Sequence, residues 1–168
     1  MRRVVLLTVL MTGLVTASVH AASRVKVASG AFQHLAWTLL AEDDADGSYC
    51  LTLKAGREPT STCNKLNLAG TGAISYVGAR GGAGPDFIVG PVTSKATHVE
   101  ITYAGGRRFT VRAISPPAGL VRGLSFYVFF ARCLTTAPTS IAGIDAAGQV
   151  VASVPQLGRG VRPATCDG

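Results

Sequence analysis

The feature that most constrains the fold of this chain is a period-two alternation of apolar and polar residues. Turn-forming Gly, Pro and Asp residues interrupt the alternation at short intervals. Successive side chains of a β-strand point to opposite faces of a sheet, so this pattern predicts strands with one buried face. About eight short strands, spaced roughly 8–12 residues apart, are typical of a β-sandwich. We therefore expect a single all-β, antiparallel β-sandwich domain.

The hairpin with the best-specified register spans residues 97–114 and turns at Ala104-Gly105-Gly106. A three-residue loop there pairs Ile101 with Phe109 and places the large apolar residues on one face. A two-residue loop mixes the two faces, because a shift of one residue turns a strand over. We expect the three-residue loop, with Gly106 in the left-handed conformation.

Other segments also carry strand patterns. Residues 124–131 are apolar on both faces, which predicts a central strand covered on each side. Residues 87–92 form a similar buried strand, and Ile74 and Tyr76 mark a short one. Two further hairpins are expected, one from segments 35–41 and 49–53, and one from 141–154 with a turn at 145–148.

The first 21 residues have the pattern of an export signal. Arg2 and Arg3 precede a short apolar run over residues 4–15, and Val19-His20-Ala21 is a small-x-Ala cleavage signature. The run is shorter than the ~20 residues that cross a bilayer. We expect cleavage after Ala21 or Ala22, a secreted or extracytoplasmic location, and one domain over residues 22–168 whose tail is irregular from about Pro155.

Four cysteines follow the expected cleavage point, so they mature in an oxidising compartment. Four cysteines allow three pairings. We favour the local pairs Cys50–Cys63 and Cys133–Cys166, the second of which ties the tail back to the central strand. The chain has no CxxC or HxxxH spacing, so we expect neither a metal site nor a cofactor.

The candidates for catalysis are sparse. His34 and His98 are the histidines left after cleavage, and each is assigned to the polar side of a strand. A Ser-His-Asp site with Asp86 or Asp145 is arithmetically feasible, but no GxSxG motif occurs. We expect both histidines to be surface residues, Trp37 to pack in the core, and the chain not to be an enzyme.

Two loops are the candidate binding loops, because scaffolds place adaptable contacts on loops. The first is expected over residues 55–72. The second, over 78–85, is rich in glycine but lacks the Gly-Lys-Ser/Thr ending of a phosphate-binding loop. The residues singled out in them are Arg57, Arg80, Gly81 and Gly82.

The formal net charge of +7 falls to +5 when the expected cleavage removes Arg2 and Arg3, since 14 basic residues then stand against 9 acidic ones. This moderate basic charge suits weak attraction to anionic cell-surface polymers. The basic residues are spread along the chain without a cluster, so we expect no nucleic-acid binding. We expect no membrane segment after cleavage of the signal. The expected partner is a protein or a cell-surface polymer.

Several segments together resemble small secreted bacterial proteins with an immunoglobulin-like sandwich and no assigned activity. The segments that carry the resemblance are 37–39, 49–51, 89–92, 98–102, 105–107, 126–130 and 144–151. The resemblance implies an immunoglobulin-like β-sandwich outside the cytoplasm. It brings no catalytic residues, and a fold alone does not license a function.

These observations favour a non-enzymatic domain, secreted or associated with the cell wall, that acts by binding or as a structural module. Two alternatives stay open. A small secreted protease inhibitor would present the Cys50–Cys63 segment as a loop braced by a disulfide. A secreted hydrolase would need a nucleophile and base pair that the sequence does not display.

Overall fold

The computed structural model describes residues 24–43, 48–56, 59–64, 74–79, 86–117, 123–131 and 137–155. Strands dominate these ranges, and every pairing between them is antiparallel, which confirms the all-β prediction. The strands are β1 (Val25–Phe32), β2 (Leu35–Asp43), β3 (Tyr49–Ala55), β4 (Pro59–Asn64), β5 (Val77–Ala79), β6 (Asp86–Thr93), β7 (His98–Thr102), β8 (Arg108–Arg112), β9 (Leu124–Ala131), β10 (Ser140–Ile144) and β11 (Val150–Pro155).

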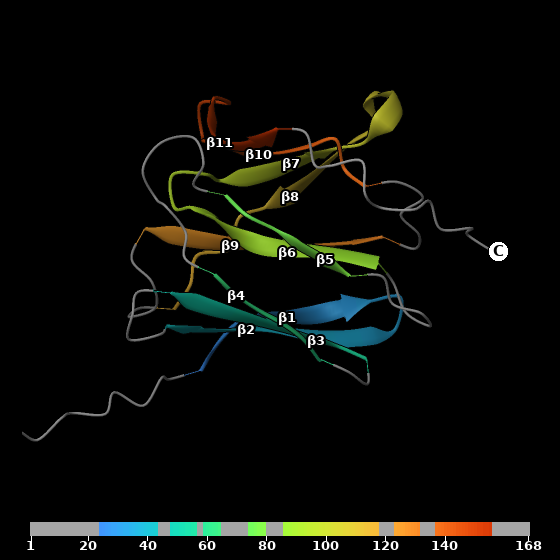
Figure 1. Cartoon of the computed structure of the whole chain (residues 1–168), viewed down its shortest axis with the longest axis vertical. Helices are drawn as coiled ribbons and strands as arrows, with labels where there is room; N and C mark the ends of the chain where they lie inside the picture. Colours follow the sequence, from blue (N-terminus) through green and yellow to red (C-terminus); the bar gives the residue numbers. More distant parts are fainter. Residues whose placement is uncertain are drawn as a thin grey trace, which may run out of the picture.

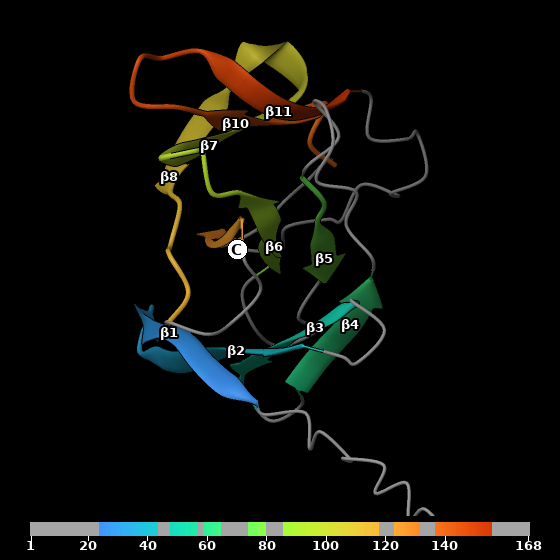
Figure 2. The same ribbon diagram turned by 90° about the vertical axis from the view of Figure 1, so that its left-hand side faces the viewer.

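The strands form three sheets that stack as layers (Figures 1 and 2). One outer sheet has the order β1-β2-β3-β4, and the other has the order β11-β10-β7-β8. The three-stranded sheet β5-β6-β9 lies between them. The stack therefore has two cores, one on each side of the central sheet.

The central sheet supplies side chains to both cores, because alternate residues of a strand point to opposite faces. Phe87 and Val89 of β6 join the lower core, which lies against the β1–β4 sheet. Ile88 and Val92 join the upper core, which lies against the β7, β8, β10 and β11 strands. β9 divides in the same way and is buried along most of its length. The prediction of a central strand over residues 124–131, covered on each side, is confirmed.

The β7–β8 hairpin has the predicted register. Ile101 pairs with Phe109, and Tyr103 N–H donates to the carbonyl of Arg107 at 2.8 Å. The turn residues Ala104–Gly106 form one turn of 3-10 helix, in which Gly106 has a φ of 78°. Burial of one apolar face and the glycine turn thus determine this register together.

Two sequence predictions about the middle of the chain are wrong in detail. Residues 59–64, predicted as part of a long loop, form β4 and pair along β3. Ile74 makes only an isolated bridge with Val92, and the short strand lies further on, at β5. β4 has no apolar alternation to reveal it, since Pro-Thr-Ser-Thr-Cys-Asn is polar or small at almost every position.

Candidate functional site

The strand ends that precede Arg57 and Arg80 lie at the same end of the molecule. Ala55, the last residue of β3, pairs with Trp37, and Ala79, the last residue of β5, pairs with Phe87. Trp37 and Phe87 both pack against the ring of Phe130. The candidate residues themselves lie outside the described part of the chain: Arg57, Arg80, Gly81 and Gly82.

Four aromatic side chains meet at this end, and we call them the Phe130 cluster: Phe32, Trp37, Phe87 and Phe130. Phe32 of β1 stacks on Phe130 of β9, with ring centroids 5.4 Å apart and planes 17° apart. The rings of Trp37 and Phe87 lie 5.5 and 6.3 Å from Phe130. Phe32, Trp37 and Phe130 are only partly buried, so the cluster is at once the rim of the lower core and part of the surface.

A glycine fixes the position of the indole. Gly30 of β1 lies opposite Trp37 of β2. A Cβ atom at Gly30 would be 2.9 Å from Cζ2 of Trp37, so the indole lies directly against the backbone of β1. Trp37 also packs against the lower core, as the sequence predicts.

The β1–β2 turn beside the cluster has an unusual backbone. Phe32 pairs with Leu35, so Gln33 and His34 are the two central residues of the hairpin loop. Their φ angles are 48° and 69°, a region that residues with side chains rarely adopt. The assignment of His34 to the polar side of a strand is therefore wrong. The alternation could not reveal the turn, because glycine and asparagine, which normally mark one, are missing.

A second aromatic group borders the upper core at the β7–β8 turn. Phe109 contacts Tyr103 edge-on at 5.7 Å and Phe129 at 5.0 Å. The guanidinium of Arg107 lies 4.9 Å above the ring of Phe109, a cation–π contact. The hydroxyl of Tyr103 is buried and has no hydrogen-bond partner among the described residues.

The environment of Tyr103 shifts its acidity. Burial raises the pKa of the Tyr103 hydroxyl to about 12, since the phenolate would lose its hydration. The charge of Arg107 lowers this pKa and that of Asp86 raises it, and both effects are smaller than that of burial. Tyr103 therefore stays neutral over the physiological range, as a buried ring with an orphaned hydroxyl.

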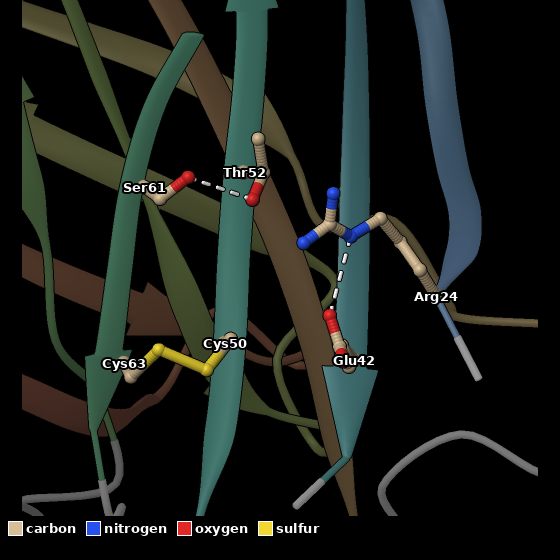
Figure 3. The surroundings of a disulfide bond; sticks show 6 residues. All are labelled: Arg24, Glu42, Cys50, Thr52, Ser61 and Cys63. Atoms are coloured by element: carbon tan, nitrogen blue, oxygen red, sulfur yellow. Dashed lines mark hydrogen bonds and ion pairs between the residues drawn. A yellow bond between two sulfur atoms is a disulfide. The ribbon is translucent and has the colours of Figure 1, made fainter. Parts of the chain in front are cut away.

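The disulfide Cys50–Cys63 is present, as predicted, and joins directly opposite residues of β3 and β4 (Figure 3). Their Cα atoms are 4.0 Å apart, and Cys63 is exposed on the outer surface of the sheet. The sequence predicts that the bond encloses a loop, whereas it staples a paired hairpin. The second predicted pair, Cys133–Cys166, lies outside the described residues.

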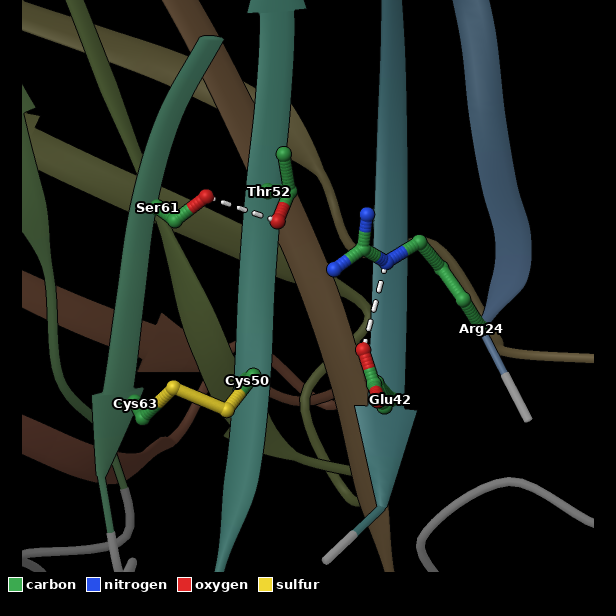
Figure 4. A network of polar contacts seen from close by, with 6 residues as sticks. All are labelled: Arg24, Glu42, Cys50, Thr52, Ser61 and Cys63. Carbon is green, nitrogen blue, oxygen red and sulfur yellow. Dashed lines mark hydrogen bonds and ion pairs between the residues drawn. A yellow bond between two sulfur atoms is a disulfide. The ribbon is translucent and has the colours of Figure 1, made fainter. Parts of the chain in front are cut away.

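Short polar contacts surround the disulfide on the same surface (Figure 4). The hydroxyls of Thr52 and Ser61 are 2.9 Å apart and link β3 to β4. Arg24 Nε donates to Glu42 Oε2 at 3.2 Å, and both side chains are solvated. An exposed ion pair of this kind contributes little stability. We find in this network no reactive group other than the disulfide.

The remaining candidates for catalysis are not brought together. Nδ1 of His98 shares a hydrogen bond of 2.9 Å with the hydroxyl of Thr97, on an exposed face. The Asp145 carboxylate accepts hydrogen bonds from the backbone N–H groups of Ala147 and Gln149, at 2.9 Å each, and so closes its own turn. Among the described residues, neither histidine contacts a carboxylate.

In the described ranges, no three His, Cys, Asp or Glu side chains are grouped so that they could hold a metal ion. The same part of the chain includes no helix long and apolar enough to span a membrane. Comparisons with protein-family models, with curated proteins and with solved structures find no match for this chain.

Proposed function

We propose that this chain is a non-enzymatic binding domain that acts outside the cytoplasm, secreted or associated with the cell wall. The observation that carries the proposal is that Ala55 and Ala79, the strand ends that precede Arg57 and Arg80, lie at the same end of the stack as the Phe130 cluster. Binding proteins with a β-sandwich commonly present loops from one end of a rigid framework. The immunoglobulin-like character of the sandwich is part of this proposal.

Two further features support an extracytoplasmic role. The Cys50–Cys63 disulfide fits an oxidising environment. The first 21 residues carry the pattern of a cleaved export signal. N-terminal sequencing of secreted material should give a chain that starts at Ala22 or Ser23, and a start before Val19 contradicts the signal.

The binding function is tested by sedimentation with isolated cell-wall material. We expect the purified mature protein to co-sediment with the insoluble wall fraction in a saturable way, in 0.15 M salt. An unrelated protein of similar size and net charge is the control for attraction by charge alone, which salt screens. A protein that stays in the supernatant at every wall concentration contradicts the proposal.

The disulfide-stapled hairpin favours one second candidate, a small secreted protease inhibitor. Inhibitors of this kind gain affinity from a segment held rigid before binding. The β3–β4 hairpin has the required brace, since Cys50 and Cys63 join strands that are paired from Tyr49 to Lys54 of β3. Inhibition of any member of a panel of secreted proteases, lost in Cys50→Ser/Cys63→Ser, would favour this candidate.

A further inference from the structure

The β1–β2 turn has a strained backbone. Gln33 and His34 both have positive φ, and both side chains are exposed to solvent. A two-residue turn of this type is normally formed by Asn-Gly, which adopts the conformation without steric cost. Exposed side chains gain no packing energy that would offset the strain. Strain retained at such a position is typical of ligand-binding segments.

The strained turn is continuous with the Phe130 cluster. Phe32 directly precedes Gln33, and its ring stacks on Phe130. Trp37 lies on β2, two residues beyond Leu35, the pairing partner of Phe32. Its ring also packs against the ring of Phe130. Two exposed polar residues thus lie next in the chain to a part-exposed group of aromatic rings. Ligand sites generally combine such an aromatic lining with a few placed polar groups.

We propose that this end of the β1–β2 hairpin binds the sugar rings of a neutral glycan. A sugar ring has a face of C–H groups, which can stack on aromatic rings, and a rim of hydroxyls. The amide of Gln33 and the imidazole of His34 each offer a hydrogen-bond donor and an acceptor for those hydroxyls. The inference rests on the proposed binding function and names the class of its ligand.

The composition of the site argues against a charged ligand. None of its five residues is a carboxylate, an ammonium or a guanidinium, so these side chains offer no permanent charge to a ligand charge desolvated against them. The site residues are Phe32, Gln33, His34, Trp37 and Phe130. The affinity for the glycan should consequently change little between 0.05 and 0.5 M salt. An attraction through the basic net charge would instead weaken as the salt concentration rises.

The experiment measures binding of three neutral hexasaccharides to the mature protein by titration calorimetry: chitohexaose, cellohexaose and mannohexaose. Trp37 is the only tryptophan, so its fluorescence reports on this end of the molecule alone. We expect at least one of the sugars to bind and to change the Trp37 emission with the same midpoint as the heat.

The decisive variant is Gln33→Asn/His34→Gly, which installs the favoured turn, removes the imidazole and shortens the amide side chain by one methylene. We expect its affinity for the bound sugar to fall at least tenfold while its melting temperature stays the same or rises. His98→Ala is the matched control, because His98 is also exposed but lies on β7 in the other outer sheet. The control should keep the wild-type affinity.

Two results overturn the inference: none of the three sugars binds, or the turn variant binds as tightly as the wild type. Either of these can occur while the protein still co-sediments with wall material, and the proposed binding function then stands without this site. Failure of the protein to sediment with the wall contradicts the proposed function itself.

Discussion

Tyr127 donates its phenolic hydrogen to the carbonyl oxygen of Ser75, at 2.9 Å. The hydroxyl of Ser75 also lies 3.1 Å from that of Tyr49. Because Tyr127 belongs to the upper core and Tyr49 to the lower core, Ser75 links the two. The backbone of Ser75 passes very close to Gly90 of β6. A Cβ atom added to Gly90 would collide with the carbonyl oxygen of Ser75.

This close approach predicts that Gly90→Ala is strongly destabilising. The colliding atoms are backbone, so a side-chain rotation cannot relieve the contact, and we expect a loss of about 3 kcal/mol or more. Gly78→Ala is the control, since a Cβ at Gly78 has ordinary contacts with Phe87 and Ile88. Urea unfolding of both variants measures the difference, and equal midpoints contradict the prediction.

The two buried tyrosines of the upper core should respond oppositely to loss of the hydroxyl. Tyr127→Phe leaves the Ser75 carbonyl without its donor and should cost about 1–3 kcal/mol. Tyr103→Phe removes a buried hydroxyl that has no partner in the described structure, so it should be neutral or stabilising. Thermal unfolding at pH 7 compares them. A Tyr103→Phe protein as unstable as Tyr127→Phe would show that the Tyr103 hydroxyl has a stabilising partner.

Alkaline pH should destabilise the fold. Burial raises the pKa of Tyr127 well above the ordinary value of 10.0 and that of Tyr103 to about 12. Burial also raises the pKa of Tyr49, and the hydrogen bond with Ser75 opposes that rise. The unfolded chain releases these protons near pH 10 while the folded chain keeps them. The unfolded state then binds fewer protons, so stability falls as the pH rises.

The stabilisation from these tyrosines is fully present below pH 10 and is lost progressively between about pH 10 and 12 for Tyr103. Urea midpoints at pH 8, 10 and 11.5, with the tyrosinate absorbance followed in parallel, measure the effect. Tyr103→Phe should show a shallower decline than the wild type. A midpoint that is constant up to pH 11.5 contradicts the assignment.

Sequence reasoning succeeded where burial determines the pattern. Residues 124–131 are apolar throughout because both faces of the central sheet are covered, and the glycines at 105 and 106 mark the turn of the β7–β8 hairpin. Sequence reasoning failed for β4, which is a polar edge strand held in place by its pairing with β3 and by a disulfide. It also failed for the turn at Gln33 and His34. Neither of these leaves an apolar or glycine signal in the sequence.

The third sheet was also beyond the sequence pattern. Alternation shows which face of a strand is buried, but not which sheet covers that face. The Phe130 cluster can be predicted only when it is known which sheets face each other. Phe32 and Phe130 come from different sheets and are far apart in the chain. The sequence therefore singled out Arg57 and Arg80 but could not reveal the aromatic rings beside the strand ends that precede them.

The disulfide should contribute measurably to stability. The 13-residue separation of Cys50 and Cys63 corresponds to about 3 kcal/mol on loop-entropy grounds. We expect Cys50→Ser/Cys63→Ser to lower the free energy of unfolding by about this amount with the strand content unchanged in circular dichroism. Non-reducing peptide mapping of the wild type should also find Cys133 joined to Cys166, and a Cys50–Cys133 peptide would contradict both pairings.

The contact between Gly30 and Trp37 makes the last prediction. In Gly30→Ala the new methyl group would lie 2.9 Å from the indole, which Phe130 confines on another side. Displacing the indole should cost about 1–3 kcal/mol and shift the tryptophan emission to longer wavelength as the ring becomes more hydrated. Ser29→Ala, at an exposed neighbouring position of β1, should change stability by less than about 0.5 kcal/mol and leave the emission unchanged. An unchanged emission spectrum in Gly30→Ala would mean that the indole does not lie against β1 in solution.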